Sequence, residues 1–408
     1  MKKKYDIIIG GGGVIGLTIA IALAEQGLSV AIVDDKPPTT EDKVKFDGRA
    51  YALSSATVKM LSVLGIWKEL VKTAQPILDM KVSEGKAGKG ASPFFMHFDH
   101  KDMDSGPIGY MVEDRFLKQI LLNKLFSNKS ISKFYGAKIV DQEINQGIIE
   151  VHFENKTSIS AKLLVGSDGR TSMIGERSGI KRNTFDYQQT SIVCAVSHEK
   201  DHLGEAHQFF MPAGPLAILP LQNNISSIVW TEQNQKADQL KKISDKKFYD
   251  ELKIRFGGFR GKISLEGQRY FFPLSLSISK TLISNRVALV GDAAHAVHPV
   301  AGQGLNLGMR DVASLVEIIT LARRRGEDYG LENILSSYAT WREFDRVTLY
   351  SFTHLINQVF SNDSPFLKTF RGIGMVAINN IPMVQRFLMR EASGFGQGLP
   401  LLMSGRRI

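Results

Sequence analysis

Two aspartates, two histidines and four glycines lie within the stretch GDAAHAVHPVAGQGLNLGMRD, at positions 291–311. These side chains could bind a metal ion or support a nucleophile, or the glycines could present backbone amides to a charged ligand. The spacing of His295 and His298 would suit metal ligands on a helix, but Pro299 and the glycines argue against a helix there. No neighbouring cluster supplies the remaining ligands, so we predict no metal site and expect His295 to pack as a structural histidine.

The N-terminal residues predict a strand, a glycine-rich turn, a helix and a second strand. Residues 5–9 are a short apolar run rich in β-branched side chains, which is typical of a buried parallel strand. Residues 14–26 have helical character and are followed by a glycine that ends the helix. Residues 28–33 form a second buried strand, so this stretch predicts one βαβ unit.

The glycines of this unit have the spacing of a dinucleotide-binding turn. Gly11 permits the tight turn, Gly13 lets a pyrophosphate approach the helix N-terminus, and Gly16 lets helix and strand pack closely. Asp34 follows the second strand and can accept hydrogen bonds from an adenosine ribose. The motif alone does not separate FAD from NAD, but its place at the N-terminus favours FAD. No second complete motif follows, which argues against a separate NAD domain.

Composition and charge limit the cellular setting. The chain has 408 residues, a net charge of +10 and one cysteine, which excludes an intramolecular disulfide and fits a reducing compartment. The basic, apolar start resembles a signal peptide, but Asp6 and the glycine run argue against one. No other segment reaches the roughly 18 apolar residues of a membrane-spanning helix. The positive charge suits nucleic acid, an anionic membrane or an anionic cofactor, or a solvated lysine-rich face; no interleaved aromatic and arginine run indicates nucleic acid.

Two later segments repeat the pattern of a strand followed by a turn. Residues 163–165 read as a strand that ends at Asp168-Gly169, with a helix expected from about Ser172. Residues 286–290 read as a strand that ends at Gly291-Asp292, before a helix from near Gly304 to about Arg325.

Taken in order, these three motifs resemble the class A flavoprotein monooxygenases, the group of para-hydroxybenzoate hydroxylase. Four linking segments resemble, within that group, the ubiquinone-biosynthesis hydroxylases of the UbiH/UbiF/VisC type. They are DGRAYALS at 47–54, GYMVEDRFL at 109–117, GPLAILPL at 214–221 and WREFDRVTLYSFTHLI at 341–356. The resemblance spans essentially the whole chain.

The resemblance implies FAD as the cofactor and assigns its binding residues. Asp292 would accept a hydrogen bond from the ribityl chain, and residues 299–306 would wrap the isoalloxazine ring. Asp168 belongs to the cofactor site and is also implicated in the use of NAD(P)H. The implied FAD-binding residues are Gly11, Gly13, Gly16, Asp34, Arg49, Arg115, Asp168, Asp292, Pro299, Gly302, Gly304 and Asn306. No catalytic base is assigned; His298 and Pro299 are expected near the flavin, and His298 faces either the ring or the substrate cavity.

The physical reading of the last motif agrees with this assignment. A helix N-terminus has free amides and about half a positive charge. Reduced flavin is anionic at its pyrimidine end, and Gly302, Gly304 and Asn306 can bring backbone amides against that end. The reduced cofactor would thereby be stabilised without an ion pair.

The expected architecture is α/β, a para-hydroxybenzoate-hydroxylase-like fold with a discontinuous Rossmann-type FAD domain. We expect a β-sheet substrate domain over the flavin and a C-terminal helical region. The expected bounds are 1–75, 111–183 and 276–345 for the FAD domain, 76–110 and 184–275 for the substrate domain, and 346–408 for the C-terminal region.

The resemblance implies an NAD(P)H- and O2-dependent hydroxylase that acts through a flavin hydroperoxide. The substrate would be a polyprenylated phenol or quinone precursor of ubiquinone, and other ubiquinone-biosynthesis proteins would be partners. The C-terminal residues 351–408 are rich in phenylalanine and arginine. This composition suits a hydrophobic tunnel for the substrate, a peripheral contact with the inner face of the cytoplasmic membrane, or a helical cap buried against the core. A cytoplasmic location is expected.

Three other functions remain open at this point. One is a same-fold hydroxylase of a small soluble phenol, and another is a flavin reductase of isoprenoid chains. The third is a non-catalytic flavin-binding component of a biosynthetic complex, although such a scaffold has no need for Arg49, Asp168 and Asp292 together. The sequence does not distinguish NADH from NADPH, the ring carbon that reacts or the oligomeric state.

Overall fold

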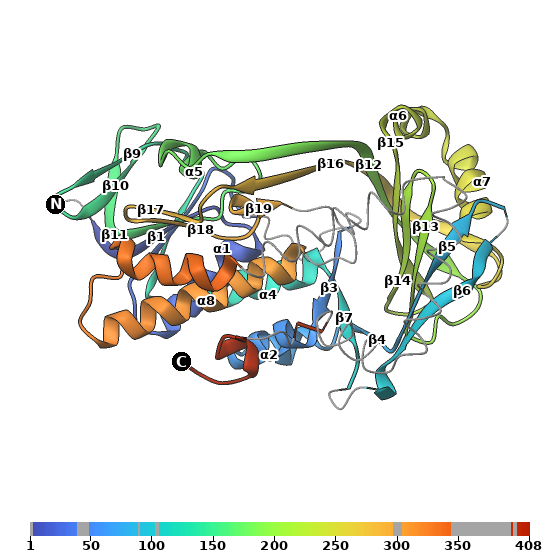
Figure 1. Ribbon diagram of the computed structural model, residues 1–408, viewed down its shortest axis with the longest axis horizontal. Helices are drawn as coiled ribbons and strands as arrows, with labels where there is room; N and C mark the ends of the chain where they lie inside the picture. The colour runs from blue at the N-terminus through green and yellow to red at the C-terminus, as the bar shows by residue number, and fades with distance from the viewer. Residues whose placement is uncertain are drawn as a thin grey trace.

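The computed structural model describes residues 3–38, 49–88, 90–102, 106–296, 304–343, 393–394 and 398–408, and their elements form three sheets (Figure 1). The first sheet is built on a parallel core in the order β18-β11-β1-β2-β8, with β17 at one edge and the antiparallel hairpin β9–β10 attached to β11. Its strands are β1 (Lys4–Gly10), β2 (Val30–Asp34), β8 (Ile131–Tyr135), β9 (Ile139–Asn145), β10 (Ile148–Phe153), β11 (Ser158–Gly166), β17 (Ile283–Ser284) and β18 (Val287–Leu289).

Helices cover this sheet because its central strands are apolar on both faces. The three isoleucines at positions 7–9 of β1 are completely buried. Helix α1 is buried through most of its length between the sheet and neighbouring helices, and α8 packs against it (Figure 1). The helices around this sheet are α1 (Val14–Glu25), α2 (Ser55–Val63), α3 (Trp67–Leu70), α4 (Asp114–Ser127), α5 (Met173–Arg177) and α8 (Gly304–Arg324); residues 332–343 are also helical.

The second sheet has eight strands in the order β19-β16-β12-β15-β14-β13-β5-β6. One face packs on α6 (Asn234–Lys242) and α7 (Asp245–Phe256) through a core that includes Trp230 and Phe248. The strands are β5 (Asp79–Lys86), β6 (Gly90–Asp99), β12 (Arg182–His198), β13 (Glu205–Met211), β14 (Gly214–Leu221), β15 (Ile225–Gln233), β16 (Ile263–Ser279) and β19 (His295–Ala296).

A small third sheet lies between the two large ones (Figure 1). It has the order β3-β7-β4 and is antiparallel. Met111 of β7 packs with Phe98 and Phe210 of the second sheet in one apolar cluster. Its strands are β3 (Ala50–Ser54), β4 (Gln75–Ile77) and β7 (Gly109–Glu113).

The β12–β16 pair joins the large sheets. Each of these strands has 17 residues, and the pair runs from the parallel sheet across the top of the molecule into the second sheet (Figure 1). The α/β architecture agrees with the predicted fold class. The domain boundaries stay a prediction, and most of the expected C-terminal helical region lies outside the described residues.

Among the described residues, no helix combines the length and apolar character required to span a membrane.

Candidate functional site

The glycine-rich turn connects β1 to α1 and leaves open space at the helix N-terminus. Gly11 has a φ of +109°, and a side chain there would collide with the backbone of Ser167. Gly13 is the N-cap of α1, where no side chain caps the helix, and a Cβ on Gly13 would meet no atom within 4 Å. A Cβ on Gly16, in contrast, would press on the Gly11 carbonyl and lie 2.7 Å from Ser167 Oγ. The amides in the first turn of α1 have no intrahelical acceptor, so this helix N-terminus can receive a phosphate group.

Asp34 lies at the end of β2, beside this turn. One carboxylate oxygen accepts the Gly12 amide, and the other accepts the Lys36 amide at 2.8 Å. A carboxylate has about four acceptor positions, so Asp34 retains the capacity to accept the hydroxyls of a ribose.

The end of β11 is fastened to the same turn. Ser167 donates its amide to the Gly10 carbonyl at 2.8 Å, and its hydroxyl lies 3.0 Å from the Gly10 and Gly11 carbonyls. Asp168, the next residue, accepts the Ser172 hydroxyl and the Ile174 amide, at 2.5 and 3.0 Å. Asp168 therefore shapes the turn into α5, a structural task that the sequence motif did not specify.

The third motif follows β18 and forms what we call the GD loop, residues 291–296. It contains a 3-10 turn at 291–293 and then the short strand β19. The Asp292 side chain is 48% exposed, and its carboxylate lies 3.3 Å from Arg170 Nε. The Asp292 carboxylate is therefore exposed enough to accept a further hydrogen bond, which is the role that the resemblance implies for it toward the ribityl chain.

The first turn of α8 lies against β3 and α2. The Asn306 side chain accepts the Ser54 amide at 3.0 Å and the Thr57 hydroxyl at 2.8 Å, and it donates to the Ala52 carbonyl at 2.8 Å. The Asn306 side chain is thus committed to packing, whereas backbone amides in a first helical turn have no intrahelical acceptor. These amides, together with that of Gly304, can face an anion.

The two predicted arginines have local ion-pair partners. Arg49 Nη2 lies 3.3 Å from the buried carboxylate of Asp114, which also accepts the Tyr51 hydroxyl at 2.7 Å. Arg115 donates to Glu113 at 2.6 Å and stacks its guanidinium 4.5 Å from the Phe116 ring centroid. The structure therefore brings Arg49 to the junction of β3, β7 and α4, and it places Arg115 in the first turn of α4.

Three predicted residues, His298, Pro299 and Gly302, lie outside the described part of the chain. His295 is described, and it is buried with only 3% of its surface exposed. Its Nε2 atom lies 2.8 Å from an Asp311 carboxylate oxygen, as expected of a structural histidine.

Sequence reasoning missed the buried cluster around Asp311. Its carboxylate accepts the Gly291 amide at 2.9 Å and the Arg342 Nε donor at 2.7 Å, and neither Asp311 nor Arg342 is exposed. Burial is the largest single effect and would raise the pKa of Asp311, but the charges and hydrogen bonds of His295 and Arg342 together outweigh it and lower the pKa. Asp311 thereby fastens the GD loop to α8; its position within the quoted motif was the only sequence signal.

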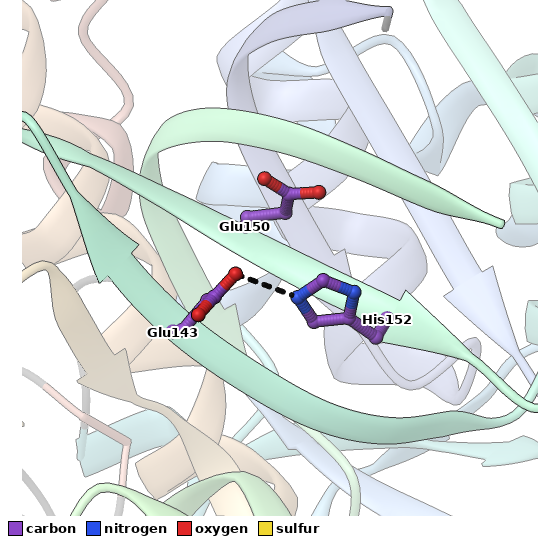
Figure 2. A group of neighbouring side chains, drawn as sticks. All are labelled: Glu143, Glu150 and His152. Atoms are coloured by element: carbon purple, nitrogen blue, oxygen red, sulfur yellow. Dashed lines mark hydrogen bonds and ion pairs between the residues drawn. The ribbon is translucent and has the colours of Figure 1, made fainter. Parts of the chain in front are cut away.

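Glu143, Glu150 and His152 gather on the β9–β10 hairpin (Figure 2). Their candidate ligand atoms lie within 4.8 Å of one another, and His152 Nε2 is 3.2 Å from Glu143 Oε1. Glu143 and Glu150 are cross-strand partners, so their proximity follows from the hairpin register. We assign no metal to this group, because the Glu143 side chain is half exposed and already pairs with His152.

Comparison with known proteins connects this geometry to FAD. A family model described as an FAD binding domain matches residues 4–343. Ubiquinone hydroxylase UbiL of Rhodospirillum rubrum is 38% identical over 406 residues, which cover 99% of this chain and 93% of UbiL. The 3-demethoxyubiquinol 3-hydroxylase of Escherichia coli is 29% identical and covers 96% of this chain and 99% of its own.

Solved structures show the same fold. The p-nitrophenol 4-monooxygenase PnpA of Pseudomonas putida has a TM-score of 0.80 at 18% identity, over 98% of this chain and 100% of PnpA. A variant of HpxO from Klebsiella pneumoniae, complexed with FAD, has a TM-score of 0.75 at 16% identity, over 96% of this chain and 99% of HpxO. The predicted fold, the FAD cofactor and the assignment as a flavin-dependent hydroxylase are confirmed. The chain belongs to the FAD binding domain family, and within it to the branch that contains the ubiquinone hydroxylases.

Proposed function

We propose that this protein hydroxylates the aromatic ring of a polyprenylated phenol or quinone precursor of ubiquinone, with FAD, NAD(P)H and O2. The observation that carries the proposal is the similarity to UbiL over 99% of the chain. The open space at Gly13 supports it, because the described residues there keep the helix N-terminus accessible to a dinucleotide.

The proposed FAD site runs along the carboxyl ends of the parallel strands. The amides behind Gly13 would hold the pyrophosphate, Asp34 the adenosine ribose and Asp292 the ribityl chain. The first turn of α8 would face the flavin ring. The full proposed set is Gly11, Gly13, Gly16, Asp34, Arg49, Arg115, Asp168, Asp292, Pro299, Gly302, Gly304 and Asn306.

When bound, FAD supplies the hydride acceptor for NAD(P)H and the activation of O2 for transfer of one oxygen atom. The chain supplies orientation and electrostatics. The first-turn amides of α8 would offset negative charge on the cofactor, and the buried Asp311 cluster holds the GD loop against that helix. The apolar cluster around Met111 and Phe210 packs the third sheet against the second.

Complementation tests the substrate class. We would express the gene in strains that each lack one ubiquinone hydroxylase and identify the quinone intermediate that disappears. Restored ubiquinone in one strain would support the proposal and identify the ring carbon. Failure in every strain, with the protein expressed and FAD bound, would refute the quinone assignment; oxygen uptake with NADH and soluble phenols would then test the small-phenol alternative.

We further propose that the protein contacts the cytoplasmic membrane peripherally, beside other ubiquinone-biosynthesis proteins. The support is chemical: a hydrophobic substrate resides in the bilayer, and the chain has a net charge of +10. The purified protein should sediment with anionic liposomes at low salt and release at high salt. An absence of binding to anionic liposomes at low salt would contradict the membrane proposal alone.

A further inference from the structure

The GD loop belongs to both large sheets. It follows β18 of the parallel sheet, and it continues into β19, which pairs with β16 of the second sheet. Ala296 is opposite Ser277 and His295 is opposite Ile278 in that pairing. The loop that is proposed to carry the ribityl contact is therefore also the edge of the sheet that contains β12–β16.

Side chains of the β12–β16 pair hold three consecutive carbonyls of this loop. Arg182, the first residue of β12, donates one guanidinium nitrogen to the Ala293 carbonyl and another to the Asp292 carbonyl, the latter at 3.1 Å. Its Nε donates to Ser277 Oγ at 2.9 Å, which fixes the plane of the guanidinium. Ser279 donates both its amide and its hydroxyl to the Ala294 carbonyl, at 2.9 and 2.7 Å.

These contacts determine where the Asp292 side chain points. The Cα of Asp292 lies between two held peptide planes, because the Gly291 carbonyl accepts the Ala294 amide at 2.8 Å and the Asp292 carbonyl accepts from Arg182. Two fixed planes on either side of a Cα atom set the direction of its Cα–Cβ bond. Arg182 suits this task because its planar guanidinium presents donors in a rigid fork. Burial lowers the pKa of Arg182 and nearby Asp168 and Asp292 oppose that effect, so the guanidinium stays charged at neutral pH.

We propose that Arg182 is a positioning residue of the flavin site, which holds the GD loop so that Asp292 meets the ribityl chain. Arg182 touches the backbone of the loop, and its effect on FAD binding passes through the orientation of Asp292. The inference rests on the proposed placement of the ribityl chain.

FAD affinity of the purified protein tests the proposal. Apoprotein is titrated with FAD and bound flavin is followed by its fluorescence and its visible circular dichroism, in the absence of substrate. Arg182→Gln should weaken FAD binding about tenfold and alter the visible dichroism of bound flavin, since losing one charge-assisted hydrogen bond costs at least that factor. The FAD affinity of Arg182→Lys should lie between those of wild type and Arg182→Gln, because an ammonium group keeps the charge but cannot reproduce the fork. The lysine variant replaces the glutamine variant in this test if the latter fails to fold.

Arg269 provides a matched control on β16. Its guanidinium also donates to two backbone carbonyls, those of Leu240 and Ile243, at 3.2 and 3.0 Å, but these lie at the end of α6. Arg269→Gln should leave FAD affinity unchanged. Equal FAD affinities of Arg182→Gln and wild type, or an equal loss of affinity in both glutamine variants, would overturn the proposal.

A double-mutant cycle separates positioning from a general structural effect. If Arg182 acts through Asp292, then Arg182→Gln should change FAD affinity by less than about twofold in an Asp292→Ala background. An equal loss in both backgrounds would overturn the proposal, as would an Asp292→Ala variant with wild-type affinity. Because no substrate is present, failure of ubiquinone hydroxylation would refute the proposed function and leave this result unaffected.

Discussion

Replacing Asp311 by asparagine should destabilise the protein far more than its single lost charge suggests. Asp311 and Arg342 are both fully buried, with Arg342 Nε 2.7 Å from the carboxylate, so the variant removes the counter-charge of a buried guanidinium. Breaking a buried ion pair by removing one partner costs about 3–5 kcal/mol. The asparagine can still accept the Gly291 amide with its oxygen, but its amide group then meets donors on Arg342 and His295.

Urea denaturation of the two proteins, followed by circular dichroism at pH 7, measures this loss. Asp328→Asn is the control, because Asp328 also pairs with a buried arginine, Arg286, but is itself 36% exposed, so water can reach the position and the loss of stability should be smaller. The pKa of Asp311 is lowered, so its contribution is present above the unfolded value of about 4 and is lost as the pH falls through the folded value. The difference between wild type and Asp311→Asn should therefore shrink in acid. A loss no larger than that of Asp328→Asn would refute the reasoning.

A pair of glycines, a buried histidine and the buried cysteine provide three further tests of the structure. Gly13→Ala should fold normally yet bind FAD at least about tenfold more weakly, because the added methyl group enters the open space at the helix N-terminus. Gly16→Ala should lower the unfolding temperature of the apoprotein, because its Cβ would press on the Gly11 carbonyl and lie 2.7 Å from Ser167 Oγ. Equal FAD affinities and equal unfolding temperatures of the two variants would contradict this contrast. Burial lowers the pKa of His207 to about 4, so between the unfolded value of about 6.5 and pH 4 the unfolded state binds the extra proton. As the pH falls through that range, the free energy of unfolding of the wild type should decrease by up to about 1.4 kcal/mol per pH unit relative to that of His207→Gln, measured by urea titration. Parallel pH profiles of the two proteins would exclude the effect. Burial raises the pKa of Cys194 to about 12, so a thiol reagent at pH 8 should leave the folded protein unmodified and titrate one thiol after denaturation; rapid reaction of the native protein would be inconsistent with the structure.

Local patterns in the sequence were sufficient to predict the main strands and helices of the parallel core. The apolar run at 5–9 became β1, the helix expected at 14–26 became α1, and the helix expected from Gly304 to about Arg325 became α8, which ends at Arg324. These elements are short-range consequences of residue type, because apolar periodicity and glycine spacing act within a few residues. A dinucleotide cofactor followed from the glycine motif, since a phosphate site at a helix N-terminus is also built locally, whereas FAD in particular came from the resemblance.

The tertiary structure alone decided how these pieces are held together. Arg182 reaches a loop more than 100 residues away, Asn306 joins β3 and α2 to α8, and Asp311 meets Arg342 inside the core. Nothing in the local sequence around a charged or amide side chain specifies which distant backbone group it will satisfy. That choice depends on how the sheets and helices pack, because a buried polar group must find its partner among whatever the fold brings within about 3 Å.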